Sequence, residues 1–187
     1  MAGGWSSKPT NPMNSKQRLS PREIIKLLDL QELPLEGGFF HQTYVSTDLV
    51  AQEHLPARYA ETKSFCTAIV YLLTPKSFSA FHRLPTDEVY HYYLGDPAEL
   101  FELHSDGSRH KTILGPDLAS GHQVQQVVQR GAWQASRVQP GGEWTVLGTT
   151  MAPGYTQSDF ELGQISALQR EFPEHRKIIQ QLTRIDT

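Results

Sequence analysis

Short runs of apolar, β-branched and aromatic residues, many alternating with polar positions, recur along most of the chain and predict β-strands. Turn-forming Gly, Pro, Asp and Ser residues separate these runs. About eight antiparallel strands in one small domain indicate a sandwich or a barrel. We expect the strands at residues 39–45, 64–73, 78–83, 88–94, 98–104, 109–114, 122–128, 132–138 and 143–151.

The two ends of the predicted domain are helical. Ser20 can cap a helix over residues 20–30, with Pro21 at its first position and Glu23 completing a capping box. A last helix begins at Pro173 and has Ile178, Ile179 and Leu182 on its apolar side. Polar residues 48–62 predict a loop or lid. The sequence therefore predicts a mainly β domain with flanking N- and C-terminal helices.

Composition narrows the class of protein. The 187 residues, with 38% hydrophobic and 20% charged side chains, predict one globular domain over residues 20–187, and residues 1–19 read as a disordered or loosely docked tail. The net charge of −3 and the absence of a basic stripe argue against nucleic acid. No secretory or membrane segment stands out, and a single cysteine fits the reducing cytoplasm.

The candidate chemistry lies in residues 79–95. Glu88, Tyr90 and Tyr92 fall on one face of the strand that Glu88 opens. His82 lies near the end of the preceding strand, so a hairpin would bring it beside Glu88. Burying an ionisable glutamate adds no stability to an apolar barrel, so a functional role would explain its position. This cluster therefore favours a ligand pocket. The alternative is an internal hydrogen bond between His82 and Glu88, with the aromatic side chains filling the barrel.

These residues resemble the first motif of the cupin superfamily. Glu88 and Gly95 have the spacing of that motif, and His82 stands at its first histidine position. Of the second motif only Gly131 remains. The segments EGGFFHQTY, FHRLPTDEVYHYYLGDP, LHSDG, LGPDL, RGAWQAS and MAPGYTQSDFEL follow in the order of one branch of small single-domain cupins, which is defined by a domain of unknown function. The resemblance covers roughly residues 21–182 and implies a cupin-type double-stranded β-helix, the jelly-roll barrel.

The resemblance also implies what the site holds. Cupin metals are usually bound by three histidines and a glutamate, but Leu84 and Gln134 occupy two of those four positions here. We therefore expect neither a metal nor another cofactor. Sugar-nucleotide epimerases, which this branch resembles in fold, work without metal through a histidine base and a tyrosine acid. By that analogy His82 is the base, Glu88 orients it, and Tyr90 or Tyr92 is the acid.

The same analogy predicts the ligand contacts. Gln134 and Ser136 could hydrogen-bond a sugar or phosphate, Tyr44 and Trp133 could stack on a ring, and Lys63, Arg83 and Arg137 could meet phosphate. Three functions stay open: a metal-independent pocket for a nucleotide, nucleotide-sugar or sugar phosphate, with or without isomerase or epimerase activity; a metal-dependent cupin enzyme, a dioxygenase or isomerase, with atypical ligands; and a binding or storage module without catalysis.

We further expect a homodimer. The outward positions Val89, His91 and Tyr93 are too apolar and aromatic for a solvated sheet face.

Overall fold

The computed structural model describes residues 18–184, so the tail predicted over residues 1–19 lies, up to residue 17, outside the described residues. The first element, α1 (Pro21–Leu27), begins with the predicted capping box: the backbone N–H of Glu23 donates to Ser20 Oγ, and the Glu23 carboxylate accepts from the backbone N–H of Ser20 at 2.8 Å. The helix ends before residue 30 because Asp29 adopts a left-handed backbone conformation (φ 52°).

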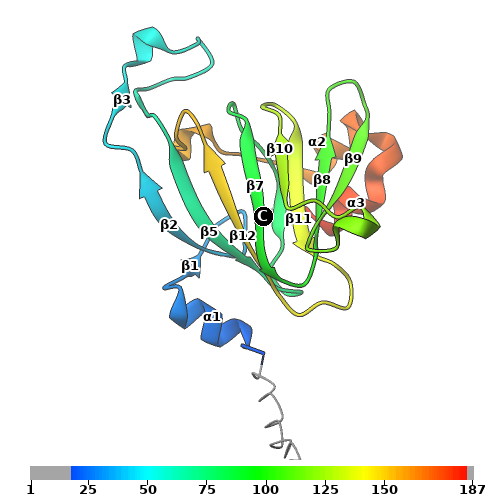
Figure 1. The fold of residues 1–187 in the computed structure, drawn as a ribbon. Coiled ribbons are helices and arrows are strands. Elements are labelled where there is room, and N and C mark those ends of the chain that lie inside the picture. Colours follow the sequence, from blue (N-terminus) through cyan, green and yellow to red (C-terminus); the bar gives the residue numbers. More distant parts are fainter. Residues whose placement is uncertain (1–17, 185–187) are drawn as a thin grey trace, which may run out of the picture.

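Two antiparallel sheets face each other and enclose the main core (Figure 1). The six-stranded sheet has the order β1-β2-β5-β12-β7-β10, and the five-stranded sheet has the order β13-β6-β11-β8-β9. The strands of the first sheet are β1 (Gln31–Glu32), β2 (Phe39–Val45), β5 (Thr67–Leu73), β12 (Thr145–Met151), β7 (Glu88–Gly95) and β10 (Gln125–Val128). Those of the second are β13 (Glu161–Leu162), β6 (Ser79–Arg83), β11 (Trp133–Val138), β8 (Ala98–Leu103) and β9 (Arg109–Leu114). The predicted jelly-roll barrel is confirmed.

The predicted hairpin between β6 and β7 is wrong. β6 pairs with β11 and β13, whereas β7 pairs with β12 and β10, so the connection at residues 84–87 crosses from one sheet to the other. Two hydrogen bonds join that connection to the turn between β10 and β11. Asp87 Oδ1 accepts from the backbone N–H of Arg130 at 2.8 Å, and the carbonyl oxygen of Leu84 accepts from the backbone N–H of Gly131 at 2.9 Å. His82 and Glu88 therefore face each other across the barrel interior instead of lying side by side in one sheet.

Three groups of buried apolar side chains hold the layers together. The first lies between the sheets and includes Tyr71, Tyr90 and Leu147. A second lies between the five-stranded sheet and the C-terminal helices, and the third joins the six-stranded sheet to α1. The C-terminal helices are α2 (Ile165–Glu171), which the sequence did not predict, a 3₁₀ turn η4 (Pro173–His175) and α3 (Arg176–Gln181).

The apolar run at residues 64–73 is split. It forms β4 (Lys63–Ser64) and β5, and Phe65 between them is half exposed. β4 pairs with β3 (Leu49–Val50) in a two-stranded sheet, and a 3₁₀ turn η1 (Gln52–His54) follows β3. This excursion projects from the end of the barrel opposite α1 (Figure 1). Among the helices within residues 18–184, none has the length and apolar character needed to cross a membrane.

Candidate functional site

An interior cavity of about 400 Å³ lies between the two sheets. The residues that line it come from both sheets and from three connections between strands: Leu33, Pro34, Glu36, Phe40, Gln42, Thr67, Ala68, Ile69, His82, Leu84, Glu88, Thr149, Met151, Tyr155, Thr156, Gln157 and Phe160. A larger hollow of about 1040 Å³ lies beside α1, but its lining contains no histidine and only partly overlaps these residues. Because His82 and Glu88 converge in the interior cavity, we take it as the candidate site.

His82 lies near the end of β6 and is only 2% exposed. Its Nδ1 lies 2.8 Å from the carbonyl oxygen of Ala80. Because a carbonyl oxygen only accepts, Nδ1 carries the hydrogen, and Nε2 of the neutral ring is the basic nitrogen. The ring of Phe160 stacks on the imidazole at a centroid distance of 5.3 Å and fixes its plane.

Glu88, at the start of β7, is the second ionisable group and is 6% exposed. Its Oε2 accepts a hydrogen bond of 2.8 Å from Nε2 of Gln134 on β11. Burial raises the pKa of the Glu88 carboxyl above its ordinary value, His82 opposes this effect, and the negative charge of Glu36 adds to it. The carboxyl is therefore suited to hold or release a proton closer to neutral pH than an exposed glutamate.

Glu36 is a third ionisable residue in the cavity, and the sequence did not predict it. Its Oε1 accepts hydrogen bonds from the Tyr71 hydroxyl at 3.1 Å and from Ser79 Oγ at 2.7 Å. The following Gly37 and Gly38 have positive φ angles, and a Cβ at Gly38 would lie 2.6 Å from the Tyr71 ring. Adjacent glycines are typical of a turn or a close backbone approach, so this pair is the signal in the sequence that could have pointed to Glu36.

Residues 155–160, here named the cap loop, close one side of the cavity with Tyr155, Thr156, Gln157 and Phe160. Burial, followed by the charge of Glu36, raises the pKa of Tyr155 to about 12, so its hydroxyl keeps its proton at neutral pH. This hydroxyl donates to Gln157 Oε1 at 3.2 Å. The tyrosine that faces the cavity with His82 and Glu88 is therefore Tyr155, which the sequence analysis missed.

The two tyrosines that the sequence placed in the site do not line the cavity. Tyr90 is buried in the core beside Tyr71 and Leu147. Tyr92 is half-buried at the far end of β7, where its hydroxyl donates to the carbonyl of Gly95 at 2.6 Å. They share a face with Glu88 as predicted, but the strand carries them away from the cavity toward the α1 end of the barrel.

Of the predicted ligand contacts, the polar residues of β11 lie in the barrel interior, and the two aromatic residues lie elsewhere. Gln134 bonds Glu88, and Ser136 is fully buried two residues further on the same face, with no hydrogen-bond partner for its hydroxyl among the described residues. Tyr44 is 53% exposed on β2, and Trp133 is buried in the core that faces the C-terminal helices. Neither of these aromatic rings lines the cavity.

The predicted basic contacts have carboxylate partners. Lys63 is fully buried and its Nζ lies 2.7 Å from Asp159 Oδ1. Arg83 makes two hydrogen bonds to Glu161, of 2.6 and 2.9 Å, and covers the Trp133 ring. Arg137 donates to Glu99 at 2.8 Å. These ion pairs explain why none of the three side chains is directed into the interior cavity.

The donor set does not fit a cupin metal. Leu84, at the second histidine position, lines the cavity but cannot ligate, and Gln134 uses its amide to donate to Glu88. Within residues 18–184, no three His, Cys, Asp or Glu side chains are grouped so that they could hold a metal ion. We therefore derive no step through a metal.

Comparison with known proteins places this geometry in a family. Residues 22–163 match the family model described as Cupin superfamily (DUF985). A search of curated proteins found no match.

Solved structures agree with that match. A hypothetical protein from Leishmania major has a TM-score of 0.80 at 27% identity, over 88% of this chain and 99% of that chain. A protein from Shewanella oneidensis has a TM-score of 0.79 at 30% identity, over 90% of this chain and all of that one (100%). A cupin 2 domain-containing protein from Halorhodospira halophila shares the fold at 12% identity, with a TM-score of 0.52 over 83% of this chain and 88% of that chain. The chain therefore belongs to the DUF985 family of the cupin superfamily.

Proposed function

We propose that the interior cavity binds a small polar molecule and that His82 and Tyr155 transfer protons on it without a metal, in a reaction of the isomerase or epimerase type. The observation that carries this proposal is the convergence of a basic His82 nitrogen, a protonated Tyr155 hydroxyl and the Glu88 carboxyl on one cavity. Moving a proton at a carbon next to a carbonyl needs a base on one side and a proton donor on the other.

Each residue has a distinct role in this proposal. The bond from Nδ1 to the Ala80 carbonyl leaves His82 Nε2 free to accept a proton, and Glu88 stabilises the imidazolium that results. Tyr155 donates to the oxygen on which negative charge develops. Phe160 keeps the imidazole in one orientation.

The fold resemblance extends the proposal to a nucleotide, a nucleotide-sugar or a sugar phosphate. The cavity volume of about 400 Å³ is at the lower end of the range for ligand pockets, roughly 300–1,000 Å³. A sugar ring is therefore the part of such a ligand that we place inside. The phosphates of the ligand would lie in an adjoining hollow of about 330 Å³. Arg58 and Arg83 border this hollow, and Leu84 and Phe160 line both it and the cavity.

The proposal is tested in two steps. A thermal-shift panel of monosaccharides, sugar phosphates, nucleoside diphosphates and nucleotide-sugars identifies binders, since a ligand at a hundred times its Kd stabilises the fold by about 2.7 kcal/mol. Binders that carry a carbonyl are then incubated in D₂O, and deuterium incorporation is followed by NMR. We expect incorporation to fall by about 10²–10⁴-fold in Tyr155→Phe and in His82→Gln.

Tyr44→Phe is the matched control, because Tyr44 is an exposed tyrosine on β2 outside the cavity. Its rate should equal that of the wild type. Ligand binding without deuterium exchange would show that the protein is a binding module without this catalysis. A Tyr155→Phe variant with full exchange activity would show that Tyr155 is not the proton donor.

A further inference from the structure

The cavity is richer in hydrogen-bond acceptors than in positive charge. Glu36, Glu88 and His82 all line it, and each offers an acceptor. Building on the proposed function, which makes this cavity the ligand site, we propose that the buried part of the ligand carries an amino group, and that a phosphate or carboxylate group is excluded from the cavity.

Glu36 is held as an acceptor by its neighbours. Ser79 Oγ donates to its Oε1 at 2.7 Å, and the Tyr71 hydroxyl, which also donates to the Gly37 carbonyl at 2.6 Å, lies 3.1 Å from the same oxygen. Both partners are neutral hydroxyls and bring no positive charge to the Glu36 carboxyl group. Both of these contacts are to Oε1, and within residues 18–184 Oε2 of Glu36 accepts no hydrogen bond.

Glu88 adds a second carboxyl to the same cavity. It receives one neutral amide donor, Nε2 of Gln134, and the other amide atom, Gln134 Oε1, is buried without a partner among the described residues. Gln134 itself is 1% exposed. Glu36 and Glu88 therefore place two carboxyl groups in the cavity, and its lining contains no lysine or arginine to balance them.

The basic side chains near this cavity do not place a positive charge beside Glu36 and Glu88. The described lining contains no lysine or arginine. Lys63 beside the cap loop is paired with Asp159, and Arg184 donates to the backbone carbonyls of Glu36 and Phe78 and lines the outer groove beside α1. His82 is the one lining residue that can become cationic, and its Nδ1–H is taken by the Ala80 carbonyl.

This distribution of charge discriminates between ligands of equal size. An ammonium group donates up to three hydrogen bonds and would form charge-assisted bonds with Glu36 and Glu88. A hydroxyl can donate only one and brings no charge. A phosphate or carboxylate is anionic at neutral pH and would meet two carboxyl groups in a poorly solvated space.

The experiment compares two sets of matched compounds by calorimetry and thermal shift with the full chain. The first set is glucosamine, glucose and glucuronate, which share a ring. The second is ethanolamine, ethylene glycol and glycolate, which are small enough to enter the cavity completely. We expect each amine to bind about tenfold more tightly than its hydroxyl analogue, because hydrogen bonds to charged groups are stronger than those between neutral groups. We expect no binding of either acid.

Glu36→Gln keeps the size of the side chain and should remove most of the preference for the amine. Glu88→Gln gives the same test if the first variant folds poorly, which circular dichroism will show. Glu174→Gln, at an exposed glutamate of η4, is the matched control and should keep the full preference.

The outcomes separate this inference from the proposed function. Tighter binding of glucuronate or glycolate than of the amines would overturn the inference and leave the cavity as the ligand site. An amine preference that survives both Glu36→Gln and Glu88→Gln would also overturn it. Binding of no compound from either set, at any concentration up to the solubility limit, would count against both proposals.

Discussion

The buried Glu88 carboxyl places an ionisable group in the cavity and lowers the stability of the folded protein at neutral pH. The carboxyl is buried, and it accepts a hydrogen bond of 2.8 Å from the neutral amide of Gln134. Because burial raises the pKa of Glu88 in the folded state, the protonated carboxyl is favoured by the fold more than by the unfolded chain. The stability that Glu88 contributes is therefore present in acid and is lost as the pH rises through the raised pKa.

We predict that Glu88→Gln is more stable than the wild type at neutral pH. The advantage should shrink as the pH falls through the raised pKa toward the ordinary value of 4.5, because the wild-type carboxyl then becomes neutral as well. Urea denaturation of both proteins across this pH range measures the difference. The same variant should lose ligand binding or turnover.

Two results would contradict this assignment. A stability difference that does not depend on pH would show that burial does not raise the pKa of Glu88. A Glu88→Gln protein destabilised by about 1–3 kcal/mol with unchanged ligand affinity would show that the carboxyl serves only as a structural hydrogen-bond acceptor.

His82 and Glu88 could be predicted from the sequence, whereas only the glycine pair after Glu36 hinted at that residue and no pattern indicated Tyr155. The first two stand in a motif with defined spacing, and the strand pattern directs them to the interior. Glu36 and Tyr155 lie in connections between strands, where no periodicity tells which side chains point inward. Their positions depend on contacts with distant residues, such as the hydrogen bonds of Glu36 with Tyr71 and Ser79.

At the scale of elements, the cap loop is positioned by a buried ion pair. Asp159 Oδ2 accepts from the backbone N–H of Thr156 at 3.1 Å, and Oδ1 accepts from Lys63 of β4 at 2.7 Å. Thr156 Oγ1 also accepts from Lys63. Because Tyr155 and Phe160 flank these residues, the pair determines where both side chains meet the cavity.

We predict that Lys63→Met destabilises the protein by about 3–5 kcal/mol, because it leaves Asp159 buried without its charged partner. The double variant Lys63→Met/Asp159→Leu should lose less, since it removes both charges. Both variants should weaken ligand binding, because the cap loop loses the contacts that position it. Urea denaturation and calorimetry measure the two effects.

Lys76→Met is the matched control, because Lys76 is an exposed lysine at the turn between β5 and β6. It should leave stability within about 0.5 kcal/mol of the wild type. A Lys63→Met protein with wild-type stability and affinity would show that the ion pair does not position the cap loop.

Strand positions followed from the sequence more closely than strand partners did. The expected bounds of β2 and β9 agree with the structure, because alternation and turn residues are local signals. The pairing of β6 and β7 was predicted wrongly because adjacency in sequence favours a hairpin. The bonds of Asp87 and Leu84 to the β10–β11 turn, which decide the crossing, join residues more than 40 positions apart.

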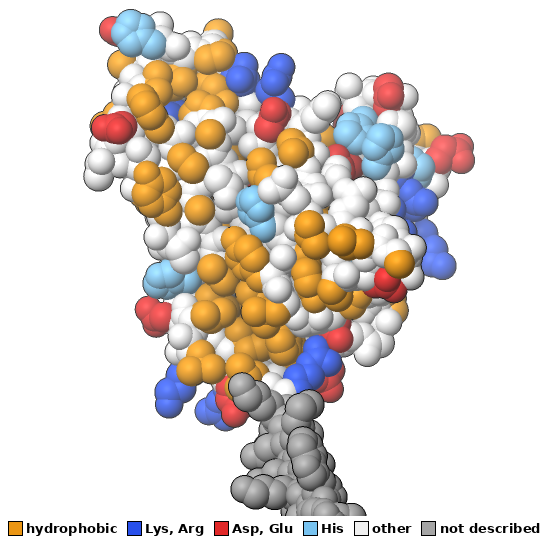
Figure 2. Space-filling view, viewed as in Figure 1, with side chains coloured by type: hydrophobic (Ala, Val, Ile, Leu, Met, Phe, Trp, Pro, Cys, Tyr) orange, Lys and Arg blue, Asp and Glu red, His pale blue; other side chains and the backbone are white. Residues whose placement is uncertain are grey.

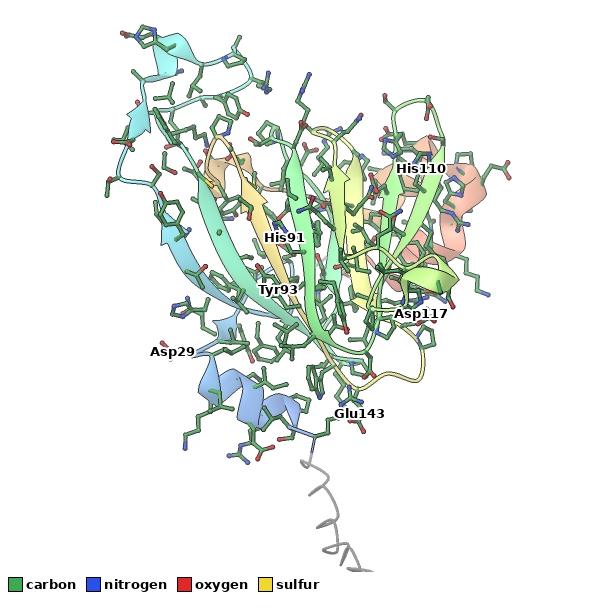
Figure 3. The ribbon with its side chains drawn as sticks, viewed as in Figure 1. Asp29, His91, Tyr93, His110, Asp117 and Glu143 are labelled. Carbon is green, nitrogen blue, oxygen red and sulfur yellow. The ribbon has the colours of Figure 1, made fainter. Side chains whose placement is uncertain are left out.

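The two faces of the six-stranded sheet serve different roles in the whole molecule. The inner face carries Glu88 and Tyr90, and the outer face carries Val89, His91 and Tyr93; Figure 3 labels the last two on β7. On the outer face the rings of His91 and Tyr93 are nearly parallel, at a centroid distance of 6.3 Å. A Cβ at Gly148 of β12 would lie 2.3 Å from the Tyr93 hydroxyl, so the tyrosine ring lies across the neighbouring strand on this face.

We predict that two copies of the chain associate through this outer face. Val127 of the edge strand β10 lies beside Val89 in the sheet register and is 45% exposed, and Tyr93 is 51% exposed. Figure 2 shows hydrophobic side chains gathered over this side of the molecule. A contiguous exposed apolar area is typical of an interaction site. The commonest assembly that buries such an area is a dimer in which the same patch of two copies meets about a two-fold axis.

Sedimentation velocity and light scattering test the dimer at micromolar concentrations. Val127→Lys should shift the protein to a monomer, because it places a charge in the contact while costing the monomer at most about 0.5 kcal/mol at an exposed position. Leu27→Lys is the control, since Leu27 is 67% exposed on α1 at the end of the barrel, and it should remain dimeric. A wild-type protein with the mass of one chain at every concentration would refute the dimer, and a Val127→Lys protein that stays dimeric would move the contact to another face.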